Sequence, residues 1–260
     1  MDKLSKEATI ALIAAEKAGE LLMQQWGKQI SSTKKKDQSP VTVYDHASEE
    51  IIKNILHKQF PADSFYGEET TKDRTAKRVW VIDPIDGTFN FMRGFPEFCI
   101  SIALIEQGKT TLGIILLPAT GDLYHAKRGE GAMLNGKKLN VSRVKELSQA
   151  SAYPDGSFSS KERKKATLRI INHFCPITNH IRILGSSVLG LTYLAAGRFD
   201  LYISEGAKPW DHAAASLLIQ EAGGKVTSFG KPGYDPFSCG IVATNGKLHS
   251  LVIKELGKIS

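Results

Sequence analysis

The segment VWVIDPIDGTFNF, residues 79 to 91, begins as an apolar strand and ends on two aspartates that are followed by Gly-Thr. Pro84 cannot continue the hydrogen bonding of a strand ladder, so the chain is expected to turn directly after Asp83. The side chains of Asp83 and Asp86 can then converge, and they repel each other unless a cation lies between them. Carboxylate oxygens suit Mg²⁺, and a substrate phosphate can complete its coordination.

A purely structural alternative exists for this turn. In an Asp-Pro turn the carboxylate often accepts backbone hydrogen bonds, and Asp83 alone would favour that interpretation. One turn needs only one capping acid, so the added Asp86-Gly87-Thr88 favours a metal site. Gly87 allows close approach to the backbone, and Thr88 can cap the next segment and offer its hydroxyl to a water.

Two further acidic segments occur at the expected ends of elements. Glu68 lies in Gly67-Glu68-Glu69, after a short strand, and Asp211 lies in the first turn of a helix that opens at KPWD. Alone, the first would be a solvated pair and the second a favourable helix-dipole residue. Together with Asp83 and Asp86 they predict a multi-metal site for phosphoryl transfer.

The hydrophobic pattern predicts an α/β chain with two halves, residues 1–145 and 146–260. The first half is expected to hold an amphipathic helix ending near Gly27, a helix over 46–59, a strand over 79–82 and an antiparallel meander between 98 and 134. In the second half, helices are predicted over 159–172, 187–196, 210–222 and 247–256, and strands at 181–183, 201–203 and 241–245. No Pro/Ser-rich linker separates the halves, so we expect them to share one interface.

Composition narrows the class of protein. Of 260 residues, 42% are apolar and 23% charged, as in an ordinary globular protein. The apolar run near the N-terminus is interrupted at Glu16 and Lys17, and no stretch approaches the roughly 18 apolar residues of a membrane span. We therefore expect a cytoplasmic protein without a signal peptide or membrane segment.

The three cysteines are Cys99, Cys175 and Cys239, which are far apart and form no C-x-x-C pair. This spacing predicts buried, reduced thiols rather than disulfides or a zinc site.

The net charge of +7 is compatible with an anionic substrate or a nucleic acid. Basic residues gather at 34–36 and 161–165, but no aromatic residues interleave with them and no nucleic-acid-binding module is recognisable. The second run is interpreted as a solvated face. A nucleic-acid partner is therefore disfavoured, although the sequence leaves it open.

Taken in order, several segments resemble the inositol monophosphatase family of magnesium-dependent, lithium-sensitive phosphatases. They are PVTVYD (40–45), GEE (67–69), WVIDPIDGTFNF (80–91), GSS (185–187), KPWDHAAA (208–215) and EAGG (221–224). The resemblance implies a layered α-β-α-β-α sandwich, shared with fructose-1,6-bisphosphatases, and a homodimer. It also implies hydrolysis of a small phosphate monoester such as inositol monophosphate.

The resemblance further implies roles for individual residues. Two or three Mg²⁺ ions would be held by Glu68, Asp83, Asp86, Asp211 and the carbonyl of Ile85, with Asp83 bridging two of them.

The same resemblance implies that Thr88, hydrogen-bonded to Asp45, orients the attacking water together with Glu68. The backbone amides of Gly87 and Thr88 would receive the phosphate, and Ser187 and Asp211 would lie on the substrate side. Lys34 matches a mobile lysine-bearing loop, although the adjacent lysines at 35 and 36 leave its register open.

The expected chemistry is direct attack of water on phosphorus, with metal ions neutralising charge on the oxygens. A covalent aspartyl-phosphate mechanism would need a D-x-D-G-T strand end, whereas these acids are spaced D-x-x-D. A non-enzymatic alternative is a basic RNA- or protein-binding regulator on a phosphatase scaffold. The intact acids argue against it as the sole function.

Substrate choice is where the sequence departs from the family pattern. Inositol-selective members carry a glutamate seven residues before the helix-opening aspartate, but here Ser204 occupies that position and Glu205 follows it. On a strand, a shift of one residue turns a side chain to the opposite face. A broad or different range is therefore expected, with fructose 1,6-bisphosphate, histidinol phosphate and a nucleotide phosphate as further candidates.

The histidines and aromatic residues near these motifs are given structural roles. His46, His125 and His212 are interpreted as packing or solvent-facing residues rather than general acids. Tyr44 and Trp210 are expected to belong to the core.

Overall fold

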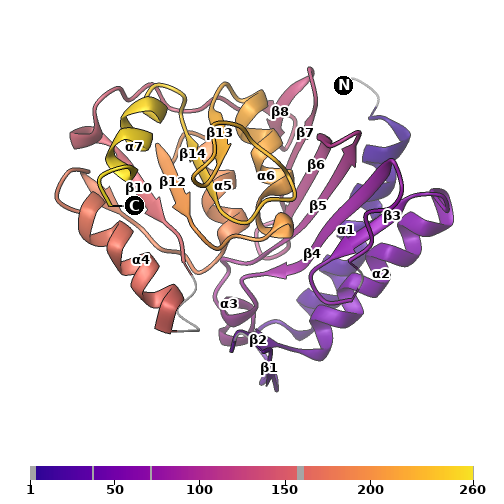
Figure 1. Ribbon diagram of the computed structural model, residues 1–260. Helices are drawn as coiled ribbons and strands as arrows, with labels where there is room; N and C mark the ends of the chain where they lie inside the picture. The colour runs from indigo at the N-terminus through magenta and orange to yellow at the C-terminus, as the bar shows by residue number, and fades with distance from the viewer. Residues whose placement is uncertain (1–3, 37, 71, 157–160, 260) are drawn as a thin grey trace.

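The computed structural model describes residues 4–36, 38–70, 72–156 and 161–259. Two β-sheets alternate with three pairs of helices, so the molecule has five layers (Figure 1). The layered α-β-α-β-α sandwich expected from the sequence is confirmed.

The first two layers come from the N-terminal part of the chain. Helices α1 (Lys6–Gln25) and α2 (Val43–Gln59) cover one face of a seven-stranded sheet. Along this sheet the strands are β3 (Ser64–Gly67), β4 (Arg78–Asp86), β5 (Cys99–Glu106), β6 (Lys109–Leu117), β7 (Asp122–Lys127), β8 (Gly131–Leu134) and β9 (Lys137–Lys138). Strand β3 is parallel to β4, and the others pair antiparallel, which confirms the predicted meander.

Both faces of this sheet are buried, which explains the unbroken apolar run at the start of β4. Trp80 and Ile82 pack towards α1 and α2, whereas Val79 and Val81 pack towards the interior of the molecule. Alternate side chains of a strand point to opposite faces, so a strand covered on both sides is apolar throughout.

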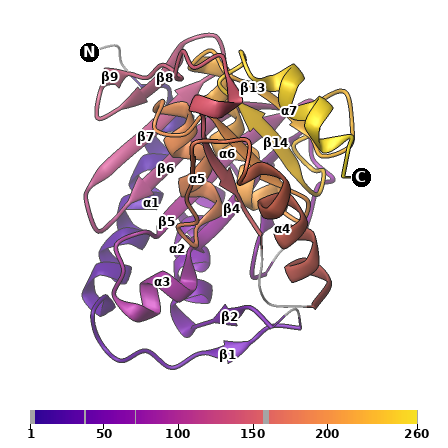
Figure 2. The ribbon, with the colours of Figure 1, turned by 90° about the vertical axis from the view of Figure 1, so that its left-hand side faces the viewer.

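The other three layers come from the rest of the chain. Helices α5 (Ser187–Ala195) and α6 (Pro209–Glu221) lie between the two sheets. The second sheet has the order β11 (His180–Ile181), β10 (Ser151–Pro154), β12 (Leu201–Ser204), β14 (Ile241–Thr244) and β13 (Lys225–Ser228). Helices α4 (Lys161–Phe174) and α7 (His249–Leu256) cover its outer face, near the C-terminus (Figure 2).

Short elements complete the fold. They are β1 (Thr33–Lys34) paired with β2 (Pro40–Val41), helix α3 (Thr88–Arg93) and the 3₁₀ turn η1 (Leu147–Gln149). Strands β10 and β13 were not predicted, and the expected start of α4 at Ser159 lies outside the described residues. None of the helices among the described residues is both long and apolar enough to cross a membrane.

The cysteines depart in part from expectation. Cys99 is buried, but Cys175 and Cys239 are exposed, so the prediction of three buried thiols was wrong. Cys175 follows the last residue of α4, and Cys239 lies between β13 and β14. Both therefore belong to connecting segments, which run over the surface.

Candidate active site

A cavity of about 970 Å³ opens where the end of β4 meets the starts of α5 and α6. Its wall also includes residues of the segment between β1 and β2, of α3 and α4, and of the end of β12. The two predicted halves of the chain therefore both line it.

Three carboxylates converge in this cavity. Oxygen atoms of Asp83, Asp86 and Asp211 all lie within 4.8 Å of one another. Strand β4 continues through Pro84, and its pairing with β5 shifts register between Asp83 and Asp86. The expectation that Pro84 ends the strand was thus wrong, because a bulge tolerates the missing N–H.

The hydrogen bond of the structural alternative is present at the Asp83 turn, and it is compatible with a metal site. The backbone N–H of Ile85 donates to Asp83 Oδ1 at 3.1 Å, as in a capped turn. Asp211 is held similarly in the first turn of α6, where the N–H of Lys208 donates to its Oδ2 at 2.6 Å. These bonds fix the carboxylates in place and leave lone pairs for a cation.

The electrostatics of the cluster fit a divalent cation. Burial and the negative charges of Glu68 and Asp86 raise the pKa of Asp83 well above its ordinary value. Burial and the charge of Glu68 likewise raise the pKa of Asp211. Burial raises the pKa of Asp86 to about 7, although the hydrogen bond from Ser186 lowers it. Buried carboxylates that repel one another and offer only hard oxygen donors are the ligands that Mg²⁺ takes.

Asp86 is also bound by the first residues of α5. The backbone N–H groups of Ser187 and Val188 donate to it at 3.2 and 3.0 Å, and the Ser186 hydroxyl donates to its Oδ2. The positive end of a helix dipole thus faces this carboxylate. Sequence reasoning noted the GSS segment but gave Ser186 no role.

Thr88 and Asp45 are brought together as the resemblance implied. Thr88 Oγ1 lies 2.9 Å from Asp45 Oδ1 and 3.0 Å from the carbonyl oxygen of Ile85. The other carboxylate oxygen of Asp45 accepts from the N–H and hydroxyl of Thr42, both at 2.7 Å. Helix α3 is capped by Gly87 rather than by Thr88, so the hydroxyl is free of the capping role first considered for it.

Glu68 lies in the cavity wall but is paired with a lysine. Lys35 Nζ is 2.7 Å from Glu68 Oε1 and also bonds Glu69, so Lys35, and not Lys34, reaches the site. The match to Lys34 was wrong, since that side chain is exposed on β1. Burial alone would lower the pKa of Lys35, but the charges of these glutamates outweigh it and the pKa is raised.

Ser187, Ser204 and Glu205 all line the cavity. Strand β12 ends at Ser204 and the chain bends at Glu205, so strand alternation does not turn Glu205 away. Its carboxylate pairs with Arg169 of α4.

Asp155, which the sequence analysis missed, lies beside these residues at the end of β10. The signal was present, because Tyr153-Pro154-Asp155-Gly156 ends a strand on an acid and a glycine, as Ile85-Asp86-Gly87 does.

The three histidines given structural roles from the sequence, His46, His125 and His212, do not line the cavity. His212 is buried, with Nδ1 2.8 Å from the Tyr234 hydroxyl and Nε2 3.1 Å from the Ser238 carbonyl oxygen. His46 is exposed and His125 is half-buried. Their interpretation as packing or solvent-facing residues is consistent with these positions.

The two aromatic residues both pack in the core. Trp210 packs against a buried hydrophobic cluster, as expected, and it also lines the cavity, with Lys72 Nζ 4.0 Å from its ring centre. Tyr44 packs edge-on against Phe91, as expected of a core residue.

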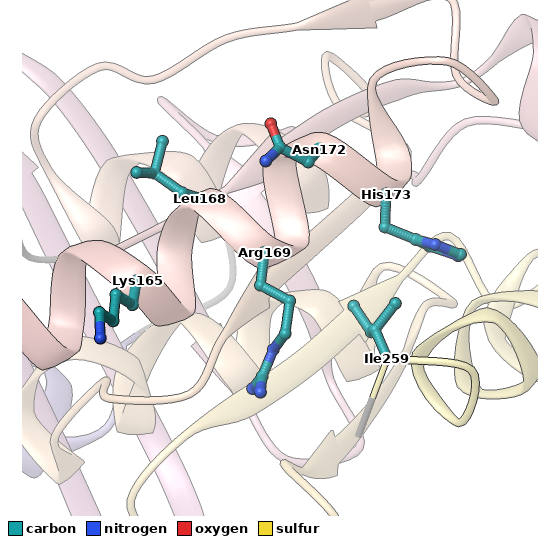
Figure 3. A pocket seen from close by; sticks show the side chains of 6 residues that line it. All are labelled: Lys165, Leu168, Arg169, Asn172, His173 and Ile259. Atoms are coloured by element: carbon teal, nitrogen blue, oxygen red, sulfur yellow. The ribbon is translucent and has the colours of Figure 1, made fainter.

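A second hollow, of about 590 Å³, lies on the outer side of α4 (Figure 3). It is lined by Lys165, Leu168, Arg169, Asn172, His173 and Ile259. Among the described residues this lining contains the cations of Lys165 and Arg169 and no carboxylate. Arg169 connects it to the first cavity through Glu205.

Comparison with known proteins agrees with this geometry. A sequence model described as the inositol monophosphatase family matches residues 3–260. The chain is 35% identical to the fructose-1,6-bisphosphatase/inositol-1-monophosphatase of Thermotoga maritima, over 100% of this chain and 97% of that protein. It is 36% identical to inositol monophosphatase 3 of Solanum lycopersicum, over 96% of each chain. It is also 36% identical to the Nus factor SuhB of Xylella fastidiosa, over 93% of this chain and 91% of that protein.

Solved structures give the same result. The Thermotoga maritima IMPase superposes with a TM-score of 0.89 at 33% identity, covering 96% of both chains. The inositol monophosphatase of Anabaena superposes with a TM-score of 0.87 at 32% identity, covering 97% of this chain and 96% of that one.

Proposed function

The chain belongs to the inositol monophosphatase family and is a phosphoric monoester hydrolase, and from this premise we propose that it hydrolyses a small phosphate monoester, such as inositol monophosphate, by Mg²⁺-dependent direct attack of water. The observation that carries the proposal is the convergence of Asp83, Asp86 and Asp211 in one cavity. Each of these carboxylates accepts local hydrogen bonds, but gathering all three at one point costs repulsion that a bound cation would relieve.

We propose that these three carboxylates, the carbonyl of Ile85 and Glu68 hold two or three Mg²⁺ ions. When bound, Mg²⁺ supplies charge neutralisation for the phosphate oxygens and lowers the pKa of water. The protein's part is to orient the reactants. Thr88 can give its hydroxyl proton to Asp45, which leaves its lone pairs available to a water.

Gly87 supports a phosphate site at the start of α3. Its φ of 86° is left-handed, and a Cβ at this position would lie 2.8 Å from the Glu97 carbonyl oxygen. Only glycine fits such a conformation without strain, so the backbone N–H groups of Gly87 and Thr88 can approach an anion closely.

The proposal is tested by phosphate release from inositol monophosphate with Mg²⁺, with chelator and with Li⁺. Activity should require Mg²⁺, be inhibited by Li⁺ and be poorly supported by Ca²⁺, which prefers looser coordination. Full turnover in excess chelator would contradict it. A single turnover in ¹⁸O-labelled water should place the label directly in phosphate, whereas a covalent enzyme intermediate would not.

Fructose 1,6-bisphosphate, histidinol phosphate and a nucleotide phosphate remain candidate substrates. A panel of these esters ranked by kcat/KM with Mg²⁺ would identify the preferred one. We also propose a cytoplasmic homodimer, on the resemblance alone, and sedimentation equilibrium would test the dimer.

A second candidate function is a basic regulator that binds RNA or protein. It is favoured by the relatives named Nus factor SuhB and by the basic lining of the hollow on α4. Replacing Lys164 and Lys165 by glutamate should weaken RNA binding in a gel-shift assay without loss of phosphatase activity. RNA binding that is unchanged in this variant would count against the basic face of α4.

A further inference from the structure

Asp155 is a buried acid in the cavity wall that the proposed chemistry does not use. It lies just after β10, it is 9% exposed, and its N–H donates to the Ile203 carbonyl oxygen at 2.8 Å. Its Oδ2 accepts hydrogen bonds from the Ser187 and Tyr202 hydroxyls, both at 2.6 Å. These bonds hold the carboxylate in one orientation.

The described partners of Asp155 leave its negative charge without a balancing cation. They are two hydroxyls and the backbone N–H of Gly156, which are neutral. Glu205, the other acid on this side, is instead paired with Arg169. A fixed carboxylate at a cavity wall repels phosphate and accepts hydrogen bonds from neutral hydroxyl groups.

Ser187 places this acceptor close to the proposed reaction centre. Its N–H donates to Asp86 Oδ1 at 3.2 Å, while its hydroxyl donates to Asp155 Oδ2 at 2.6 Å. One residue therefore spans the distance between the carboxylate cluster and Asp155. A small ester whose phosphate lies at the cluster would present its alcohol portion to Asp155.

We propose that Asp155 accepts a hydrogen bond from a hydroxyl of the alcohol portion, so that the cavity selects phosphate esters of polyhydroxy alcohols. This inference rests on the proposed phosphatase function. It replaces the expectation of weak discrimination that was based on Ser204. Pro154 of β10 pairs with Ile203 of β12, so Asp155, which directly follows β10, supplies a fixed acceptor beside Ser204.

The test compares Asp155→Asn with the wild type on two esters, inositol 1-phosphate and 4-nitrophenyl phosphate, whose alcohol portion has no further hydroxyl. The kcat/KM for inositol 1-phosphate should fall about 10- to 100-fold, mainly through KM, as expected for loss of a charge-assisted hydrogen bond. The value for 4-nitrophenyl phosphate should change less than about threefold. An equal loss on both esters, or no loss on either, would overturn the inference.

Two further variants test the assignment to Asp155. Tyr202→Phe removes one of the two hydrogen bonds that orient the Asp155 carboxylate, so it should change the ratio of the two kcat/KM values in the same direction as Asp155→Asn but by a smaller factor. Glu205→Gln should change that ratio less than Asp155→Asn does. A larger change in Glu205→Gln would assign hydroxyl recognition to Glu205 and overturn the inference for Asp155.

Calorimetric titration measures ligand binding without hydrolysis, so it tests the inference for Asp155 separately from the proposed function. If the wild type hydrolyses neither ester, the proposed function is wrong. Asp155→Asn should even then weaken binding of inositol 1-phosphate without weakening binding of inorganic phosphate. Equal affinities of variant and wild type for inositol 1-phosphate would overturn the inference.

Discussion

At the scale of single residues, Asp86 links the fold to the proposed chemistry. One side of its carboxylate is bound by the amides at the start of α5, and the group also belongs to the cluster with Asp83 and Asp211. When no cation is bound, the repulsion among these carboxylates lowers the stability of the folded state.

Asp86→Asn should separate the two roles. We expect turnover to fall by orders of magnitude, because an anionic ligand is lost, while the metal-free variant melts at a higher temperature than the metal-free wild type, because repulsion is relieved. Steady-state assays and melting curves with and without Mg²⁺ measure both effects. Glu16→Gln, an exposed change on α1, should alter neither, and near-normal rates for Asp86→Asn at low Mg²⁺ would show that Asp86 only caps the turn.

Lys35 provides a second prediction, with its neighbour as the control. Its ammonium group competes with a cation for Glu68, since Nζ lies 2.7 Å from the Glu68 carboxylate. Lys35→Ala should therefore lower the Mg²⁺ concentration that gives half-maximal thermal stabilisation, whereas Lys34→Ala should leave it unchanged. Equal shifts in the two variants would show that only the net charge of the loop matters.

At the residue scale, the sequence allowed the convergence of three acids to be predicted. Asp83 and Asp86 flank the irregular end of β4 and Asp211 lies in the first turn of α6, where local hydrogen bonds fix the direction of a carboxylate. Lys34 was chosen from its match to the lysine-bearing loop of the family, and adjacent lysines in a loop carry no periodic signal that would correct this register. Only the long-range pairing with Glu68 distinguishes them.

At the scale of elements, the start of α5 is the feature that positions the site. Ser186 is the N-cap of this helix and accepts from the Leu189 N–H at 3.1 Å, while its hydroxyl donates to Asp86. The same hydroxyl therefore caps a helix and orients a proposed metal ligand.

Ser186→Ala should cost about 1–2 kcal/mol of unfolding free energy, as for other N-caps, and should also reduce kcat/KM. Ser5→Ala, at the N-cap of α1, removes an equivalent bond to Ala8 N at 3.3 Å. It should lower stability by a comparable amount without affecting activity. Urea denaturation and steady-state kinetics on both variants provide the comparison, and equal activity losses would contradict a positioning role for Ser186.

The elements that sequence reasoning missed share a physical cause. Strands β10 and β13 have four residues each, too few for alternation to be recognised, and β10 ends on a proline. Their existence depends on pairing with β12 and β14, which lie far away in the sequence. The long helices and the meander were predictable because their periodicity is local.

At the scale of the whole molecule, the cavity lies between the two predicted halves. Asp83 and Asp86 come from the first half and Asp211 from the second, so neither half carries the whole cluster. A boundary near residue 146 thus remains a proposal about folding units. The proposed active site needs residues from both sides of this boundary.

The pH dependence of the unfolding free energy tests how the fold holds the buried His249. Burial and the charge of Lys225 lower the pKa of His249 from its ordinary 6.5 to about 4. Its ring lies 3.3 Å from the Thr227 hydroxyl and 3.2 Å from the Thr244 hydroxyl, which joins α7 to β13 and β14. The folded state therefore holds this imidazole neutral at a pH at which the unfolded chain protonates it.

The sign of the effect follows from this difference. The stability that depends on neutral His249 is fully present above pH 6.5 and is lost progressively as the pH falls towards 4. When no metal is bound, the raised pKa values of Asp83, Asp86 and Asp211 make the protein more stable as the pH falls, which is opposite to the effect of His249. The slope of unfolding free energy against pH in the wild type alone therefore does not isolate His249. Comparison of His249→Gln with the wild type cancels their contribution, because the carboxylates are common to both proteins.

Urea unfolding between pH 4.5 and 7 should accordingly show a shallower loss of unfolding free energy in His249→Gln than in the wild type. His46→Gln, on the exposed side of α2, should keep the wild-type slope. Identical slopes in all three proteins would mean that His249 takes up its proton in the folded state without cost, and that the packing of α7 over β13 and β14 opens before the imidazole is charged.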